Sequence, residues 1–280
     1  PTLSEAVTGF AASRPLPRWA PKPYRDQPSS DLNARSVVLF ADTFNRYFEP
    51  ANLTAAQNVL EAGGYRVHTP APQDGARPLC CGRTFLSAGL VDEARIEAQR
   101  TLAALLPYIK QGVRVVGLEP SCLLTLRDEF EAMIPGQDAA TLAGATEMFE
   151  EFLARQSQDG ELSLSLKPPA QRVLLHGHCH QKAFDVMSTV EQTLRLIPQM
   201  EVEVISSSCC GMAGAFGYGK DTVSATRQMA ELDLLPAVRK ADPETIIVAD
   251  GTSCRHQIAD LSDRTALHVA RVLEMALAPV

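Results

Sequence analysis

The sequence lacks the features of a membrane-spanning or secreted protein. Its 280 residues contain no apolar run close to the roughly 18 residues that a membrane helix needs, and the longest candidates, 37–41 and 113–118, have the length of buried strands. The first ten residues have neither the basic start nor the apolar centre of a secretory signal. We therefore expect a soluble, cytoplasmic protein without a membrane span, and we leave open peripheral docking to an acceptor at the inner face of a membrane.

Positive charge is scarce as well. The chain has 26 Lys and Arg against 33 Asp and Glu, which gives a formal net charge of -7. A protein that binds the phosphate backbone of DNA or RNA needs a basic stripe, and this sequence offers none. Nucleic acid is therefore not expected among its partners.

The N-terminal residues lack the apolar periodicity of a domain. The chain begins at Pro1 rather than at a methionine, and residues 1–35 are rich in proline. This composition is typical of an extended linker, so we interpret 1–35 as a Pro-rich N-terminal extension whose start is a cut or processed end.

What the chain does have is seven cysteines. The number is odd, which excludes a fully paired disulfide framework, and a chain of this length does not need one for stability. Reduced thiols in a cytosolic compartment are the better interpretation. Each cysteine lies next to the end of a predicted strand.

Two halves of the chain repeat one plan. In the first, predicted strands at 36–41, 65–68 and 113–118 alternate with helices at 53–62 and 92–110; in the second, strands at 172–175, 202–205 and 245–249 alternate with helices that run to 196 and from 221 to 239. Cys80 and Cys209 lie 129 residues apart, and Cys122 and Cys254 lie 132 apart. Near-constant offsets indicate a duplication.

This pattern predicts an α/β fold with two pseudo-symmetric Rossmann-like halves, 36–165 and 166–280, and mainly parallel sheets. Ligands of such sheets bind beyond the carboxyl ends of the strands, where the cysteine loops fall.

The cysteines of the second half are the strongest candidate ligands. Two adjacent cysteines followed by glycine can present two thiolates from one tight turn to the same metal, and thiolates select iron-sulfur clusters, zinc or copper(I). Cys179, Cys209, Cys210 and Cys254 supply four, enough for a four-iron cluster or a zinc ion. The first half supplies Cys80, Cys81 and Cys122. The position of the first half that matches Cys179 is occupied by Thr43.

Other interpretations remain open from the residues alone. The thiols could be buried structural groups, and Cys179 could be a nucleophile activated by a neighbouring imidazole. The glycines at 211, 214, 217 and 219 do not have the GxGxxG spacing of a phosphate-binding loop. The histidines around Cys179 could be ligands, hydrogen-bond donors or proton carriers, and His256, two residues after Cys254, is the nitrogen ligand that we expect.

The motifs CCG at 80–82 and 209–211, GHCH at 177–180 and SCRH at 253–256, together with Cys122, resemble the cysteine-rich (CCG) domain family of heterodisulfide reductase and of glycolate oxidase iron-sulfur subunits. The stretches 117–130, 174–183, 209–221 and 248–258 look like the C-terminal part of FAD-linked dehydrogenases of D-lactate and other 2-hydroxy acids. The chain departs from the full family pattern at Thr43, and at Thr125 and Gln257, where a further cysteine is expected.

The resemblance implies an iron-sulfur electron-transfer module, with a [4Fe-4S] cluster as its cofactor. Electrons would come from ferredoxin-type clusters and ultimately from a flavin that has oxidised a hydroxy acid such as D-lactate, glycolate or 2-hydroxyglutarate. FAD is then expected only in a partner domain, so the partners are FAD-linked oxidase and ferredoxin-type domains or subunits. The alternative is a zinc-binding or metal-free docking domain of the same complex.

Overall fold

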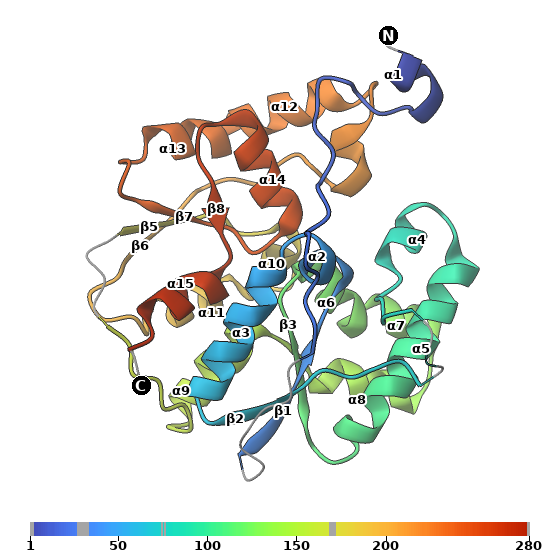
Figure 1. Ribbon diagram of the computed structural model, residues 1–280, viewed down its shortest axis with the longest axis vertical. Coiled ribbons are helices and arrows are strands. Elements are labelled where there is room, and N and C mark those ends of the chain that lie inside the picture. The colour runs from blue at the N-terminus through green and yellow to red at the C-terminus, as the bar shows by residue number, and fades with distance from the viewer. Residues whose placement is uncertain (1–2, 27–33, 74, 76, 168–171, 279–280) are drawn as a thin grey trace.

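The fold consists of two four-stranded sheets, one in each half of the chain (Figure 1). The computed structural model describes residues 3–26, 34–73, 75, 77–167 and 172–278. The first sheet has the order β2-β1-β3-β4 and the second the order β6-β5-β7-β8, and all the pairs that these strands form are parallel. Their bounds are β1 (Arg35–Phe40), β2 (Tyr65–His68), β3 (Arg114–Gly117), β4 (Thr146–Met148), β5 (Arg172–Leu175), β6 (Glu201–Val204), β7 (Ile246–Val248) and β8 (Ala266–Leu267). The predicted α/β fold with two similar halves and parallel sheets is confirmed.

Helices connect the strands and cover both faces of each sheet. Before and within the first half they are α1 (Leu3–Thr8), α2 (Thr43–Tyr47), α3 (Pro50–Ala62), α4 (Arg83–Ser87), α5 (Val91–Ile109), α6 (Pro120–Arg127), α7 (Glu129–Met133), α8 (Gln137–Ala145) and α9 (Phe149–Gln158). The second half contains α10 (Cys179–Ala183), α11 (Met187–Leu194), the 3-10 helix η1 (Gly214–Tyr218), α12 (Val223–Leu232), α13 (Leu234–Lys240), α14 (Thr252–Leu261) and α15 (Val269–Ala276).

The structure differs from the predicted elements in several places. The helix predicted to run to 196 is two helices, α10 and α11. The helix predicted at 221–239 is two helices that meet at Asp233, because Pro236 has no backbone N–H and is accommodated in the first turn of α13. Strands β4 and β8 have no counterpart among the predicted elements, since three and two residues are too few to show a period of two.

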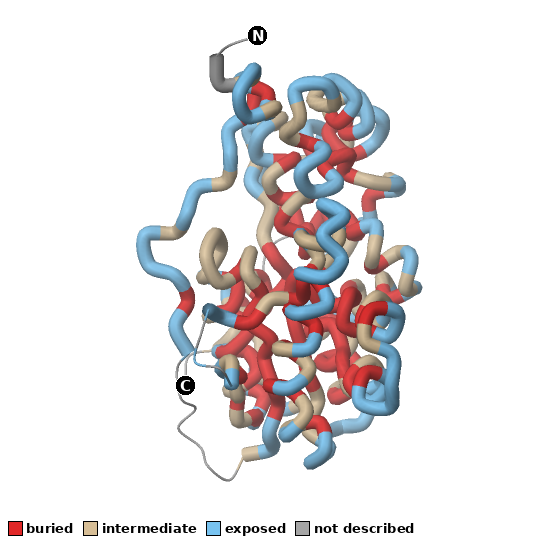
Figure 2. The backbone as a smooth tube through the Cα atoms, turned by 90° about the vertical axis from the view of Figure 1, so that its right-hand side faces the viewer, coloured by how far each residue is buried: buried red, intermediate tan, exposed pale blue. Residues whose placement is uncertain are grey.

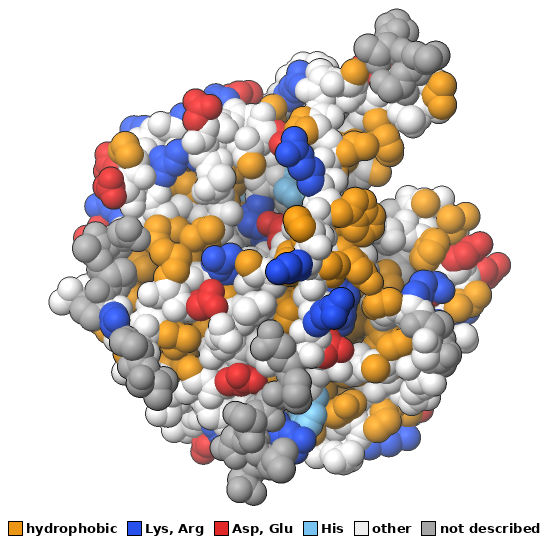
Figure 3. Space-filling model, viewed as in Figure 1, with side chains coloured by type: hydrophobic (Ala, Val, Ile, Leu, Met, Phe, Trp, Pro, Cys, Tyr) orange, Lys and Arg blue, Asp and Glu red, His pale blue; other side chains and the backbone are white. Residues whose placement is uncertain are grey.

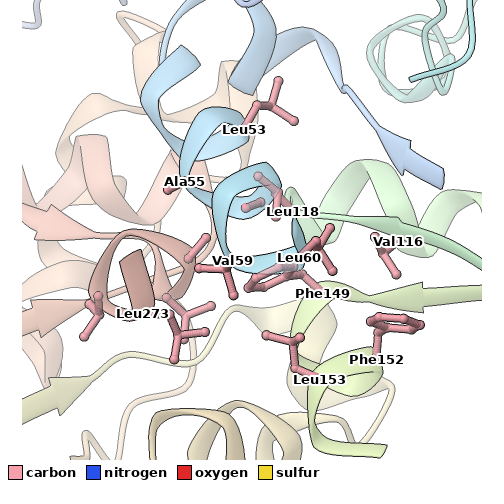
Figure 4. Packing of buried hydrophobic residues seen from close by; sticks show 14 of the residues in the cluster. Leu53, Ala55, Val59, Leu60, Val116, Leu118, Phe149, Phe152, Leu153 and Leu273 are labelled. Atoms are coloured by element: carbon pink, nitrogen blue, oxygen red, sulfur yellow. The ribbon is translucent and has the colours of Figure 1, made fainter. Parts of the chain in front are cut away.

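The two halves share one hydrophobic core between their sheets. Helix α3 packs against α15, and α9 packs against α11, so a layer of helices from both halves separates the sheets. Figure 4 shows Leu60 of α3, Phe149 of α9 and Leu273 of α15 in this layer. These side chains are completely buried. Because each half covers apolar surface of the other, we expect the halves to fold as one cooperative unit.

The N-terminal segment crosses from one half to the other. Phe10 pairs with Gly219 in an antiparallel bridge in the second half, and the Ala20 N–H donates to the Tyr47 oxygen in the first. Figure 2 shows this segment as a largely exposed stretch of chain along the side of the molecule, and Figure 3 shows hydrophobic side chains gathered on the face that it crosses. Helix α1 lies at its start, within the stretch interpreted from the sequence as an extended linker.

Candidate metal centre

The two Cys-Cys-Gly turns have the same backbone geometry. Gly82 and Gly211 have φ angles of 78° and 84°, in the left-handed region that glycine adopts without strain. A Cβ atom at Gly82 would lie 2.8 Å from the Ala94 oxygen, and one at Gly211 would lie 2.6 Å from the Thr226 oxygen. Glycine is therefore required at both turns by conformation and by space.

The other motif positions also coincide between the halves. Thr43 and Cys179 are each the first residue of a helix, α2 and α10, directly after the N-cap residue. Cys122 and Cys254 are each the third residue of a helix, α6 and α14. Thr43 and Cys179 lie 136 residues apart along the sequence, close to the offsets of 129 and 132 between the matched cysteines.

The structure brings the four cysteines of the second half together as a chain of neighbouring thiols. Cys179 contacts Cys209, Cys209 contacts Cys210, and Cys210 contacts Cys254. Cys254 and Cys210 are buried, Cys209 is half-buried and Cys179 is exposed. Cys179 and Cys254 lie at the starts of the helices after β5 and β7, and Cys209 and Cys210 lie in the loop after β6, so the carboxyl ends of three adjacent strands of one sheet supply them.

Hydrogen bonds within this chain of thiols separate their pKa values. Bonds from the thiols of Cys179 and Cys210 lower the pKa of Cys209 to about 2. A bond from Cys210 likewise lowers the pKa of Cys254 well below its usual range, despite burial, and the charges of His176 and His178 act in the same direction. Cys179 and Cys210 have raised pKa values because they donate these hydrogen bonds and are removed from water. A site that holds thiolates among soft sulfur donors suits iron-sulfur clusters, zinc or copper(I).

The histidines near the second centre lie in different environments. His176 is buried beside Cys210 and Cys254, and one ligand atom from each of the three lies within 4.8 Å of the other two. The expected nitrogen ligand, His256, is not in that group; its Nδ1 lies 3.4 Å from the hydroxyl of Tyr218. The role of His256 as a ligand thus stays a prediction. Sequence reasoning did not single out His176, because nothing in the sequence distinguishes it from the neighbouring histidines.

His178 and His180 lie at the N-terminal end of α10. His178 is the N-cap of α10, and its Nδ1 accepts a hydrogen bond from the backbone N–H of His180 at 3.1 Å. The Nε2 of His180 lies 3.5 Å from Arg83 of the first half. Burial, together with the charges of His178 and Arg83, lowers the pKa of His180 to about 4, which leaves its imidazole neutral at neutral pH.

The first half also brings its three cysteines together. Cys81 contacts both Cys80 and Cys122, and the hydroxyl of Thr43 bonds to Cys80 where a fourth thiol would stand. Burial and the nearby Glu119 raise the pKa of the Asp42 carboxyl to about 6. Although Cys81 donates to Cys122, burial and the charges of Asp42 and Glu119 raise the pKa of Cys122 to about 12.

The pKa values of Cys80 and Cys81 are raised as well, by hydrogen bonds to the next thiol and by burial. In the second half, by contrast, the pKa values of Cys209 and Cys254 are lowered. The first half therefore presents neutral thiols, which are poorer metal ligands than thiolates.

Polar side chains of one half reach the other half beside the second centre. The Glu119 carboxylate accepts a hydrogen bond from the Thr252 backbone at 2.8 Å, and Arg255, in the SCRH motif, donates to Glu49 at 2.8 Å. Within the second half, Gln257, at a position where the family pattern expects cysteine, donates to the backbone oxygen of Cys210 at 2.8 Å. Sequence reasoning could not pair these residues, since their partners lie in distant segments.

A cavity of about 380 Å³ lies between the halves. Its walls include the thiols of Cys179 and Cys209 from the second half and the side chains of Phe44 and Arg83 from the first. The centre in the second half is therefore open to a bound molecule on the side that faces the first half.

The model of the family described as CCG, the cysteine-rich domain, matches residues 173–259. This part of the chain is a cysteine-rich CCG domain. The CCG domain thus extends from β5 to α14 and includes all four cysteines of the second centre.

Curated relatives resemble a longer part of the chain. One subunit of the anaerobic glycerol-3-phosphate dehydrogenase of Escherichia coli is 27% identical over 86% of this chain and 59% of its own length. D-2-hydroxyglutarate dehydrogenase of Pseudomonas putida is 27% identical over 85% of this chain and 22% of its own. Lactate utilization protein A of Bacillus velezensis is 24% identical over 85% of this chain and 98% of its own.

The chain therefore spans only about three fifths of the first of these relatives and about a fifth of the second. Within the described residues, no helix is long and apolar enough to cross a membrane.

Proposed function

We propose that this chain is an iron-sulfur electron-transfer module of an FAD-linked dehydrogenase of 2-hydroxy acids. The observation that carries the proposal is the convergence of Cys179, Cys209, Cys210 and Cys254 on one edge of the second sheet. These four thiols would hold a [4Fe-4S] cluster, whose chemistry is the transfer of single electrons. The relatives named as dehydrogenases support the assignment to a redox complex.

The surrounding residues would hold and tune the bound cluster. Gly211 donates its backbone N–H to Cys209 at 3.3 Å, and hydrogen bonds to sulfur are one of the means by which proteins set a cluster's potential. Gln257 holds the Cys-Cys turn through the Cys210 oxygen, and Lys182 places a positive charge near Cys254, Cys179 and Cys209. That charge favours the anionic form of the centre.

The expected partners follow from the proposal. FAD would reside in a neighbouring oxidase domain or subunit, and ferredoxin-type clusters would pass electrons from the flavin to this chain. Residues 36–165 and 166–280 are proposed as the two halves of the module, with 1–35 as an extension that leads to the neighbouring domains. The hydroxy acid would be of the D-lactate, glycolate or 2-hydroxyglutarate class.

Metal analysis of the anaerobically purified chain tests the proposal. We expect iron with acid-labile sulfide and a visible absorption band that dithionite bleaches. Cys254→Ser should lose most of this iron, and Cys122→Ser, at the matched position of the first half, should keep it. Zinc without a chromophore would contradict electron transfer.

A zinc-binding or metal-free docking domain is the alternative function. The tight group of His176, Cys210 and Cys254 favours it, because a single ion needs ligand atoms closer together than a four-iron cluster does. The same metal analysis separates the two functions.

A further inference from the structure

His176 has the surroundings of a metal ligand. It follows β5, and its side chain is completely buried. The backbone N–H of His176 donates to the Val248 oxygen at 2.8 Å, which continues the pairing of β5 with β7. This bond fixes the start of the side chain relative to Cys254, which lies on the helix after β7.

The two ring nitrogens of His176 differ in their partners. Nδ1 lies 2.9 Å from the hydroxyl of Ser207, whereas Nε2 is buried and has no partner within hydrogen-bond distance and angle among the described residues. The polar neighbours of the ring on the other side are the sulfur atoms of Cys210 and Cys254, and His176 lowers the pKa of Cys254. A buried polar atom without a partner loses its hydrogen bond to water and gains none in return, so its retention calls for an explanation. Metal-bound histidines have this arrangement, since a hydrogen bond at one nitrogen orients the ring and leaves the other nitrogen for the metal.

The other histidines of this region, like His176, use one ring nitrogen within the protein, so the difference lies in the second nitrogen. In His178, Nδ1 accepts from the backbone of His180, and in His268, Nδ1 accepts from the backbone of Ala270. His256 lies against the hydroxyl of Tyr218. Among the described histidines, His176 is the one with a buried ring nitrogen that lacks a hydrogen-bond partner, and it lies beside two buried thiols.

We propose that His176 binds the metal centre of the second half through Nε2, next to the thiolates of Cys210 and Cys254. This assignment rests on the proposed function only in requiring a metal at this place. Imidazole is neutral whereas thiolate carries a negative charge, so a histidine ligand raises the reduction potential of an iron-sulfur centre. The second half then supplies five donors. Three of them, Cys179, Cys209 and Cys210, line the cavity, and Cys179 is the exposed one.

Nitrogen hyperfine coupling in pulsed electron paramagnetic resonance tests the assignment. The full chain is loaded anaerobically with ferric iron and sulfide and reduced with dithionite. We expect the strong ¹⁴N coupling of a directly bound imidazole in the unmodified chain and in His256→Ala, and its loss in His176→Cys. The cysteine variant keeps a donor at this position, so it should retain its iron, unlike a variant that fails to fold.

Two outcomes would overturn the assignment. One is the absence of strong nitrogen coupling in the unmodified chain, as expected if His176 instead donates Nε2–H to the sulfur of Cys254. The other is a coupling that persists unchanged in His176→Cys.

Titration with Co²⁺ separates this assignment from the proposed function. If the chain binds no iron-sulfur cluster, electron transfer fails as a function. The His176 assignment still stands if the visible bands of the Co²⁺-loaded chain shift in His176→Cys toward those of an all-thiolate site and stay unchanged in His256→Ala. Identical Co²⁺ spectra for the unmodified chain and His176→Cys would sink it.

Discussion

Glu119, in the first half, accepts a hydrogen bond from the backbone N–H of Thr252, in the second half, at 2.8 Å. Its other carboxylate oxygen accepts from the hydroxyl of Ser121 at 2.6 Å. Glu119 is 2% exposed, so both bonds are shielded from water. One side chain therefore joins the starts of α6 and α14, the two helices that carry Cys122 and Cys254.

Replacement of Glu119 by alanine is expected to lower the free energy of unfolding by about 1–3 kcal/mol, because the N–H of Thr252 is left buried without an acceptor and α6 loses its N-cap. Urea denaturation of the metal-free, reduced chain measures the change. Glu131→Ala, at an exposed position of α7, is the control and should shift the stability by no more than about 0.5 kcal/mol. Equal effects of the two variants would show that the bond between the halves contributes nothing.

Glu150 is a buried acid whose two carboxylate oxygens have no hydrogen-bond partner among the described residues. Burial, with the nearby charge of Asp250, raises its pKa well above the usual range. A carboxyl group whose pKa is raised in the folded state contributes stability that is fully present below its pKa in the unfolded state, near 4.5. This stability is lost as the pH rises through its pKa in the folded state.

Glu150→Gln removes this dependence because the amide stays neutral at every pH. The variant should therefore gain stability relative to the unmodified chain between pH 5 and pH 8, by about 1.4 kcal/mol for each unit of pKa difference within that window. Thermal unfolding at both pH values measures the gain. Glu244→Gln, at an exposed position, should show none, and a gain that does not depend on pH would contradict a protonated Glu150.

Gly211→Ala tests the geometry of the second Cys-Cys-Gly turn. The new Cβ would lie 2.6 Å from the Thr226 oxygen at a φ of 84°, so we expect a loss of at least about 1–3 kcal/mol and less bound metal. Gly144→Ala, in α8 with open space around it, should instead be neutral or stabilising by about 0.5–1 kcal/mol. Unfolding and metal content are measured on both, and unchanged metal binding in Gly211→Ala would argue against a role for the turn at the centre.

Thr43→Cys tests whether the first half is a metal site that lacks one ligand. Thr43 occupies the helix position of Cys179 and bonds to Cys80, so a cysteine there would complete a set of four thiols. In a Cys209→Ser, Cys210→Ser background we expect one additional equivalent of bound Zn²⁺ or Co²⁺ per chain. Thr141→Cys, on the exposed side of α8, adds a thiol without adding a site. No gain over that control would mean that more than one thiol is missing.

The α/β class, the duplication and the cysteine turns could all be predicted from the sequence. Each depends on short-range signals: apolar runs such as 37–41, glycines after paired cysteines, and constant offsets between motifs. The boundaries of short elements could not be predicted in this way. Strand β8, with two residues, forms only because β7 is already in place beside it.

The sequence by itself determined which residue types could bind a metal and showed that they recur in two halves. It also predicted that they lie close together, because the segments that follow parallel strands meet at one edge of a sheet. Only the tertiary structure decided which groups meet there. It placed His176 rather than His256 beside Cys210 and Cys254, since β5 lies between β6 and β7 in the sheet. It also paired Glu119 with Thr252, 133 residues away, because the helices between the sheets hold the two halves together.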